Sequence, residues 1–306
     1  MSNRDQLRNE IARGLVAYET ANGALAGVRS DAARGAFIEQ VVDSIRRVEY
    51  IRLVQTRAIS AERCDPNTRA FDPLLASLAC KSAGEIDEAC WLIFLSIHCG
   101  KHLTDGWSLA RQLYSGHGPG REWTWNRVSA DPSGFRRWLD AANTNWNSAN
   151  SRPKFGNHRK YVSLAAYGER GTGAAVETYV HWVGANRSHE YVFRSALHRS
   201  GEDPRGAFDN LYRSLDAVTQ FGRLAKFDYL CMLSKCGLAN IEPASAYLSQ
   251  STGPLAGARR LFGKSHGNLD AASVRLANDL CIGMQVVEDS LCNWAKSPTR
   301  YKAFRG

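Results

Sequence analysis

The sequence lacks the short patterns that mark common metal and nucleotide sites. None of its eight cysteines forms a Cys-x-x-Cys pair, which argues against a zinc ribbon and against a loop of closely spaced iron–sulfur ligands. It also has no Walker phosphate-binding loop and no Gly-x-Gly-x-x-Gly fingerprint. We therefore expect no metal and no nucleotide cofactor.

Long apolar runs and alternating apolar runs are missing as well. No stretch approaches the length of a membrane span, and the polar segment Met1–Glu10 does not resemble an export signal. No sustained alternation of apolar and polar residues demands a sheet, so an all-α fold is predicted. The cysteines lie mostly inside apolar helical patterns, as expected for reduced core residues of a cytoplasmic protein.

The composition bounds the size of the fold and favours an anionic partner. The 306 residues are 44% hydrophobic, which is enough for one domain over 1–306 or for two lobes, 1–150 and 151–306, with a flexible turn at Asn143–Asn150 between them. Lys and Arg number 39 against 30 Asp and Glu, giving a net charge of +9. This excess of positive charge favours an anionic partner such as nucleic acid.

Apolar periodicity predicts most of the helices. The segment 86–99 is apolar almost all round and is expected to be central and buried. Asp131-Pro132, Glu242-Pro243 and Gly253-Pro254 each look like a helix start. The other predicted helices cover 4–20, 36–54, 73–81, 172–182, 189–199, 207–221, 221–236 and 274–294.

Two carboxylates near the end of the chain are candidates for chemistry. If 274–294 is one helix, Glu288 falls on its apolar side and Asp289 points away. A buried carboxylate is either a member of a structural ion pair or a general acid or base. Asp228 follows Arg223 and Lys226 within two turns of the preceding apolar helix, so the two cations are candidates to hold phosphate or to balance a carboxylate.

Basic and polar residues gather in two stretches. His98 ends the central helix, either lining a pocket with Lys101 and His102 or acting as a hydrogen-bonded core histidine. Cations that alternate with aromatic residues suit a phosphate backbone with an unstacked base. The densest such stretch contains Arg152, Lys154, Phe155, Asn157, His158, Arg159, Lys160 and Tyr161.

A histidine and a carboxylate one helical turn apart, His181 and Glu177, form the one spacing that suits a metal. No third ligand is evident.

Several blocks of the chain resemble the alpha-glutamyl/putrescinyl thymine pyrophosphorylase family, clade 3. The resemblance extends from about Phe71 onward, and the blocks are 86–94, 155–161, 227–230, 251–259 and 284–294. It implies a fold like the helix-hairpin-helix DNA glycosylases, in which Gly253, Gly257 and Arg259 belong to a DNA-binding element. Glu288 and Cys292 match an acidic motif, while Asp228 lies in a family block.

The resemblance leaves three functions open. The first is a monofunctional glycosylase that flips a bulky modified base, such as glucosylated hydroxymethylcytosine, out of double-stranded phage DNA and excises it as antiphage defence. The second is a pyrophosphorylase-like transferase of thymine hypermodification, and the third is a non-enzymatic DNA-binding protein in which Glu288 is only an ion-pair partner of Arg223. The chain lacks the Val-Asp-Thr-His type of segment that carries the catalytic aspartate of some repair enzymes, so either Asp228 or Glu288 is the candidate acid.

Overall fold

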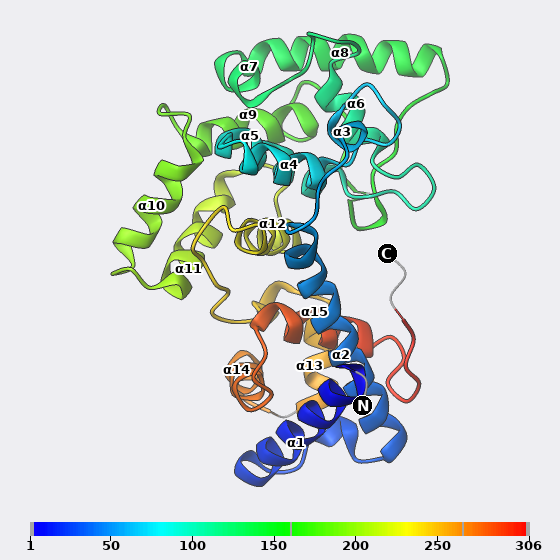
Figure 1. Cartoon of the computed structure of the whole chain (residues 1–306), viewed down its shortest axis with the longest axis vertical. Helices are drawn as coiled ribbons and strands as arrows, with labels where there is room; N and C mark the ends of the chain where they lie inside the picture. Colours follow the sequence, from blue (N-terminus) through cyan, green and yellow to red (C-terminus); the bar gives the residue numbers. More distant parts are fainter. Residues whose placement is uncertain (1–2, 160, 265, 304–306) are drawn as a thin grey trace. The chain divides into compact units, whose positions relative to one another are not determined.

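The computed structural model of the chain describes residues 3–159, 161–264 and 266–303. In these ranges helices carry the fold, and an isolated bridge between His102 and Gly106 is the only β pairing, which confirms the all-α prediction (Figure 1). Every helix in the described part of the chain is too short or too polar to span a lipid bilayer.

The chain divides into two compact units. Unit 1 combines Met1–Val54 with Pro243–Gly306, and unit 2 is Gln55–Glu242. Unit 1 is therefore built from both ends of the chain. The division does not follow the sequential halves 1–150 and 151–306.

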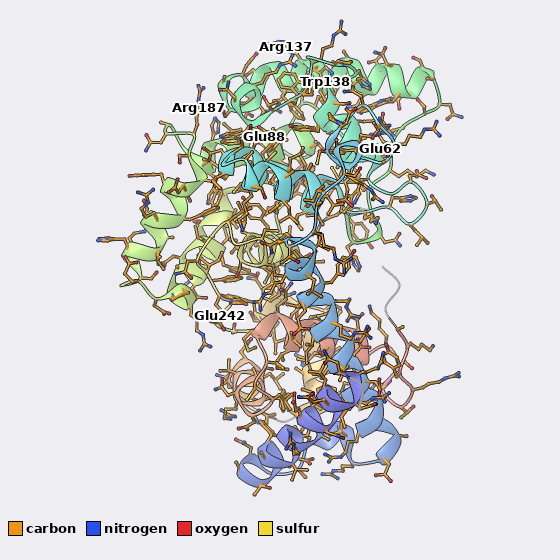
Figure 2. The ribbon with its side chains drawn as sticks, viewed as in Figure 1. Glu62, Glu88, Arg137, Trp138, Arg187 and Glu242 are labelled. Atoms are coloured by element: carbon orange, nitrogen blue, oxygen red, sulfur yellow. The ribbon has the colours of Figure 1, made fainter. Side chains whose placement is uncertain are left out.

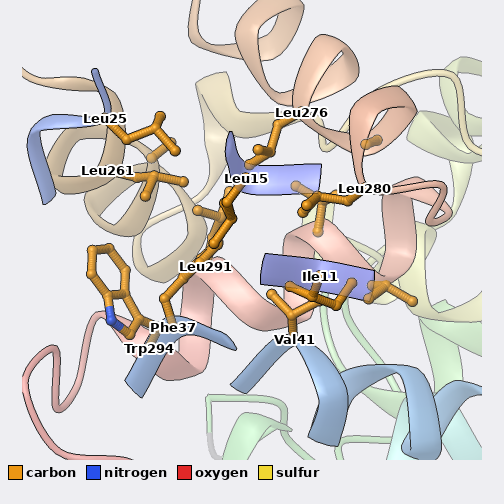
Figure 3. Close-up of a cluster of buried hydrophobic side chains, with 14 of the residues drawn as sticks. Ile11, Leu15, Leu25, Phe37, Val41, Leu261, Leu276, Leu280, Leu291 and Trp294 are labelled. Carbon is orange, nitrogen blue, oxygen red and sulfur yellow. The ribbon is translucent and has the colours of Figure 1, made fainter. Parts of the chain in front are cut away.

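Unit 1 is a helical bundle around one apolar core. The core is formed by side chains such as Leu15, Phe37 and Leu291, all at most 1% exposed, and Trp294 packs edge-on against Phe37 with ring centroids 5.2 Å apart (Figure 3). Its elements are α1 (Asn3–Asn22), η1 (Ala26–Val28), α2 (Asp31–Val54), η4 (Leu248–Gln250), α13 (Gly253–Phe262), α14 (Leu269–Asp279) and α15 (Met284–Trp294).

The predicted single helix 274–294 is wrong, because the chain breaks between α14 and α15. Cys281 adopts a left-handed conformation with φ of 52°, and the Ile282 N–H bonds to the Ala277 carbonyl. The break turns Cys281 out to solvent, whereas Leu280 and Met284 remain in the core. Periodicity missed the break because the apolar residues on both sides of it pack into the same core.

Unit 2 contains the remaining helices. Three of them begin at an Asp-Pro pair, at Asp72, Asp131 and Asp203, whose carboxylates each accept a backbone N–H of the first turn. The elements are α3 (Ala61–Cys64), α4 (Pro73–Ser82), α5 (Ile86–Cys99), α6 (Ser108–Ser115), α7 (Trp125–Ala130), α8 (Pro132–Ser148), η2 (Asn157–Arg159), α9 (Thr172–Val183), α10 (His189–Arg199), α11 (Pro204–Ser214), η3 (Leu215–Ala217) and α12 (Arg223–Lys235).

The central helix of unit 2 is α5, as predicted. Residues 89–95 are at most 1% exposed, and α4 and α12 pack against the helix. Glu88, labelled in Figure 2, lies at the polar end of α5. It accepts hydrogen bonds from the Trp125 backbone N–H at 2.7 Å and from the Tyr114 hydroxyl at 2.8 Å. These bonds join α5 to the segments before and after the 116–124 loop.

Two further predictions about element boundaries are wrong. Residues 143–148 are not a flexible turn but the end of α8, where Trp146 is buried and the Asn143 amide donates to the Leu164 carbonyl at 2.6 Å. No helix starts at Glu242-Pro243, since the next helical residues are those of η4. The sequence also gave no sign of α6 and α7, because each is only about two turns long.

Candidate active site

Asp228 lies on α12 with its carboxylate still accessible. Its Oδ2 accepts a hydrogen bond from an Arg159 guanidinium N–H at 3.2 Å, and 35% of its side-chain surface is exposed. Burial of the carboxyl among protein atoms raises its pKa, against the opposing effects of Arg159, Lys235 and Arg223. An accessible acid with a raised pKa and a fixed cationic partner is a suitable general base.

Arg159 connects the basic stretch 152–161, hereafter the basic loop, to the core of unit 2. Its side chain is 9% exposed, and its Nε–H donates to the Ile97 carbonyl on α5 at 2.7 Å. Through its second bond, to Asp228, it joins η2, α5 and α12. The structure thus places this predicted DNA-binding residue against the candidate acid.

The loop that carries Arg159 crosses the end of α5 at close range. The Gly156 N–H donates to the Cys99 carbonyl at 2.9 Å, and a Cβ on Gly156 would lie 2.8 Å from the Lys101 carbonyl oxygen. Only glycine fits at this position, so Gly156 allows the basic stretch to approach the segment after α5. The backbone hydrogen bond then holds the two segments together.

His98 is a core histidine. Its Nε2 lies 3.0 Å from the Thr172 hydroxyl oxygen, and Phe155 packs edge-on against its ring at 5.9 Å. Burial, aided by the Arg159 charge, lowers its pKa to about 3, so the ring is neutral. The interpretation as a hydrogen-bonded core residue is confirmed.

The outer part of the loop is exposed and basic. Tyr161 is 88% exposed, and Phe155 is half-buried. Lys160, also a candidate, lies outside the described residues. The exposed members are Arg152, Lys154, Asn157, His158 and Tyr161.

A tight turn after α5 adds to this surface. Lys101 is exposed, and the half-buried His102 accepts the Asp105 backbone N–H at its Nδ1 at 3.2 Å. Asp105 also lies 3.8 Å from the Lys154 ammonium, and Leu103 is 74% exposed. Sequence reasoning missed Leu103 and Asp105, since neither belongs to a periodic or basic pattern.

The two other charged residues predicted near Asp228 are buried in unit 2. Lys226 is 3% exposed, pairs with Asp216, and lies over the Tyr212 ring at 4.1 Å. Arg223 is 9% exposed and lies over the Phe227 ring at 4.9 Å. The Lys226 charge is thus satisfied by Asp216 rather than by Asp228.

Glu288, the second candidate acid, belongs to unit 1. It is 7% exposed on α15, which confirms the predicted orientation toward the apolar side. Asp289 faces away and pairs with Arg47. The catalytic role of Glu288 stays a prediction.

The glycines of α13 serve helix packing. A Cβ on Gly257 would lie 2.2 Å from the Leu291 carbonyl oxygen, and one on Gly253 would lie 2.7 Å from the Cys292 Sγ. Arg259 is exposed in the last turn of the helix. Close approach of α13 and α15 therefore accounts for both glycines, and a contact of this element with DNA stays a prediction.

The spacing that suited a metal is used otherwise. Glu177 pairs with Arg136, and His181 is exposed. Among the described residues, no cluster of three His, Cys, Asp or Glu side chains could hold a metal ion.

Comparison with known families gives one match, and it covers nearly the whole chain. Residues 32–306 match the family described as alpha-glutamyl/putrescinyl thymine pyrophosphorylase, clade 3. Comparison with curated proteins and with solved structures found no match. The family name indicates enzymes that act on a modified base of DNA. With a match over this length, the chain belongs to clade 3 of the alpha-glutamyl/putrescinyl thymine pyrophosphorylase family.

Proposed function

We propose that this protein is a monofunctional DNA glycosylase that excises a bulky modified base from phage DNA. The observation that carries the proposal is the accessible Asp228 carboxylate. Arg159, a residue of the exposed basic loop, donates a hydrogen bond to it. The family supports action on a modified DNA base.

The chemistry requires a carboxylate beside the sugar of a flipped nucleotide. Turning the base out of the duplex costs roughly a few kcal/mol, which contacts to the phosphates and to the flipped base offset. Cleavage of the N-glycosidic bond develops positive charge on the sugar. In the proposed mechanism the Asp228 carboxylate stabilises that charge and takes a proton from the attacking water.

The expected product is an abasic site in an intact strand. A strand-cleaving enzyme of this type needs a lysine nucleophile with a free amine. Lys226, the lysine closest in sequence to Asp228, is buried and pairs with Asp216. We propose hydrolysis rather than Schiff-base chemistry at Lys226, since the Asp216 carboxylate occupies its amine.

The basic loop would hold the DNA. Its exposed cations suit the phosphate backbone, and Tyr161 offers a ring that can occupy the space of the flipped base. Glucosylated hydroxymethylcytosine is one bulky base that such an enzyme would remove. The eight free cysteines suit the reducing compartment in which it would meet phage DNA.

A transferase is the second candidate, because the family name describes a pyrophosphorylase. Such an enzyme would replace a substituent of thymine while the base stays in the polymer. The third, a DNA-binding protein without activity, requires only the basic loop.

One experiment separates the three functions. Purified protein is incubated with unmodified, hydroxymethylated and glucosylated phage DNA, and the free and polymer-bound bases are then analysed. Release of a free modified base supports the glycosylase. An altered base that stays in the polymer supports the transferase, and binding without a product supports the third function.

Replacing Arg159 should shift the pH dependence of base release. The reaction needs ionised Asp228, and the Arg159 charge and hydrogen bond lower the pKa of that carboxyl. In Arg159→Gln this effect is lost, the pKa of Asp228 rises, and the acid limb of the rate profile moves to higher pH. Arg159→Lys, which keeps the charge, should move the limb less. An acid limb in Arg159→Gln that coincides with the wild-type limb would contradict the assignment.

Removing the exposed ring of Tyr161 should lower the rate of base release from duplex DNA more than the rate from single-stranded DNA. Stacking on an aromatic ring is worth about 1–3 kcal/mol per base, so Tyr161→Ala should lower the rate on duplex substrate by roughly 5- to 150-fold. Tyr161→Phe, which keeps the ring, serves as the matched control. Equal losses on duplex and single-stranded substrate would argue against this role.

A further inference from the structure

A polar pocket of unit 2 is lined by residues other than those of the candidate active site. It has a volume of about 410 Å³, and its lining includes Asn67, Arg111, Gln112, Ser115 and His117. No acidic residue lines it. A polar pocket with cationic and neutral hydrogen-bond donors suits an anion.

Arg111 is the unusual residue of this pocket. It is half-buried on α6, and within the described part of the chain its guanidinium forms neither an ion pair nor a hydrogen bond. Burial and the neighbouring Arg69 charge both lower its pKa. Two other arginines of unit 2 that are half-buried or buried have carboxylate partners, since Arg136 pairs with Glu177 and Arg159 with Asp228.

A half-buried arginine without a counter-ion loses part of its hydration, and no carboxylate of the protein compensates the loss. A bound anion would supply that compensation.

His117 also lines the pocket, and its ring lies near two tryptophan rings. It adopts φ of 67°, and its ring lies 5.6 Å from that of Trp138 and 5.5 Å from that of Trp146. The turn around it is tight, since a Cβ on Gly116 would lie 2.0 Å from the Arg121 carbonyl oxygen. Burial and the Arg111 charge lower the pKa of His117, which favours a neutral ring with one N–H to donate.

We propose that this pocket binds a phosphate group, supplied by a DNA phosphodiester or by a free phosphate anion, between the Arg111 guanidinium and the His117 imidazole. The guanidinium offers a planar fork that matches two phosphate oxygens. The pocket volume is in the range of small-ligand sites, so it has room for a sugar beside the phosphate. The site does not depend on the Asp228 chemistry.

The first test follows the His117 ring directly. Protein labelled with ¹⁵N-histidine is titrated with inorganic phosphate and, separately, with a short unmodified DNA duplex, and the His117 signal is assigned with His117→Gln. Shifts that saturate with phosphate identify a free-anion site, and shifts with DNA alone identify a phosphodiester site. Arg111→Gln should abolish either response, while the signals of the other histidines show that the variant is folded. A His117 signal that neither ligand moves overturns the proposal.

The second test applies to the DNA source. Loss of one phosphate contact should reduce the slope of log K against log salt by about 0.9 in Arg111→Gln. Arg194→Gln removes one equally charged but 72% exposed residue from α10 and should leave the slope unchanged. Equal slopes for the two variants, where DNA moves the His117 signal, overturn a direct phosphate contact. Because the duplex carries no modified base, this outcome is independent of whether base release occurs.

Discussion

Asp228→Asn should lower the rate of base release by about 10² to 10⁴-fold, the usual contribution of a positioned acid–base group. The amide has nearly the same shape as the carboxylate, and its oxygen can still accept the Arg159 N–H that now lies 3.2 Å from Oδ2. It lacks the negative charge and cannot take a proton from water. DNA affinity should change little, since the basic loop keeps its attachment to α5 through Arg159 and Gly156. Single-turnover rates and binding constants measured on the same glucosylated duplex check both expectations.

Two other variants serve as a control and as a test of the second candidate acid. Asp140→Asn removes one carboxylate from an exposed position of α8 and should leave the rate unchanged. Glu288→Gln tests the second candidate acid by itself, in the other unit. A full rate in Asp228→Asn, with loss in Glu288→Gln, would transfer the catalytic role to Glu288. Full rates in both variants would leave the protein without an assigned acid.

Gly257→Ala should destabilise unit 1 by about 1–3 kcal/mol or more, the usual cost of overpacking a close contact. The new methyl group would lie 2.2 Å from the Leu291 carbonyl oxygen, and neither α13 nor α15 can yield without moving backbone. Side chains cannot relieve a clash between a methyl group and a carbonyl of the neighbouring helix. Thermal and denaturant unfolding, followed by circular dichroism, measure the loss.

Gly35→Ala is the matched control within the same unit. Gly35 lies in α2, and a Cβ there would meet no atom within 4 Å. Alanine should therefore stabilise the helix by about 0.5–1 kcal/mol, because glycine loses more backbone entropy on folding. A loss of stability in both variants, or in neither, would contradict the close approach of α13 and α15.

Local patterns in the sequence were enough to predict most helices and the nature of the buried positions. The helix α5 begins and ends where its apolar pattern does, and Asp131-Pro132 marks the start of α8. The buried side of α15 was also predictable, because it depends on spacing within a few turns. Such features are local, so a single sequence contains them.

Contacts between distant residues decided the rest. Arg159 and Asp228 are 69 residues apart in the sequence. No local sequence pattern indicates that the arginine is buried and donates a hydrogen bond to the aspartate. The extension of α8 depends on the burial of Trp146 and on the bond from Asn143 to Leu164, both tertiary contacts. The break between α14 and α15 was hidden, since both helices direct apolar residues into one core. Periodicity reports which side of a segment is apolar, but only packing determines where the chain bends and which charges meet.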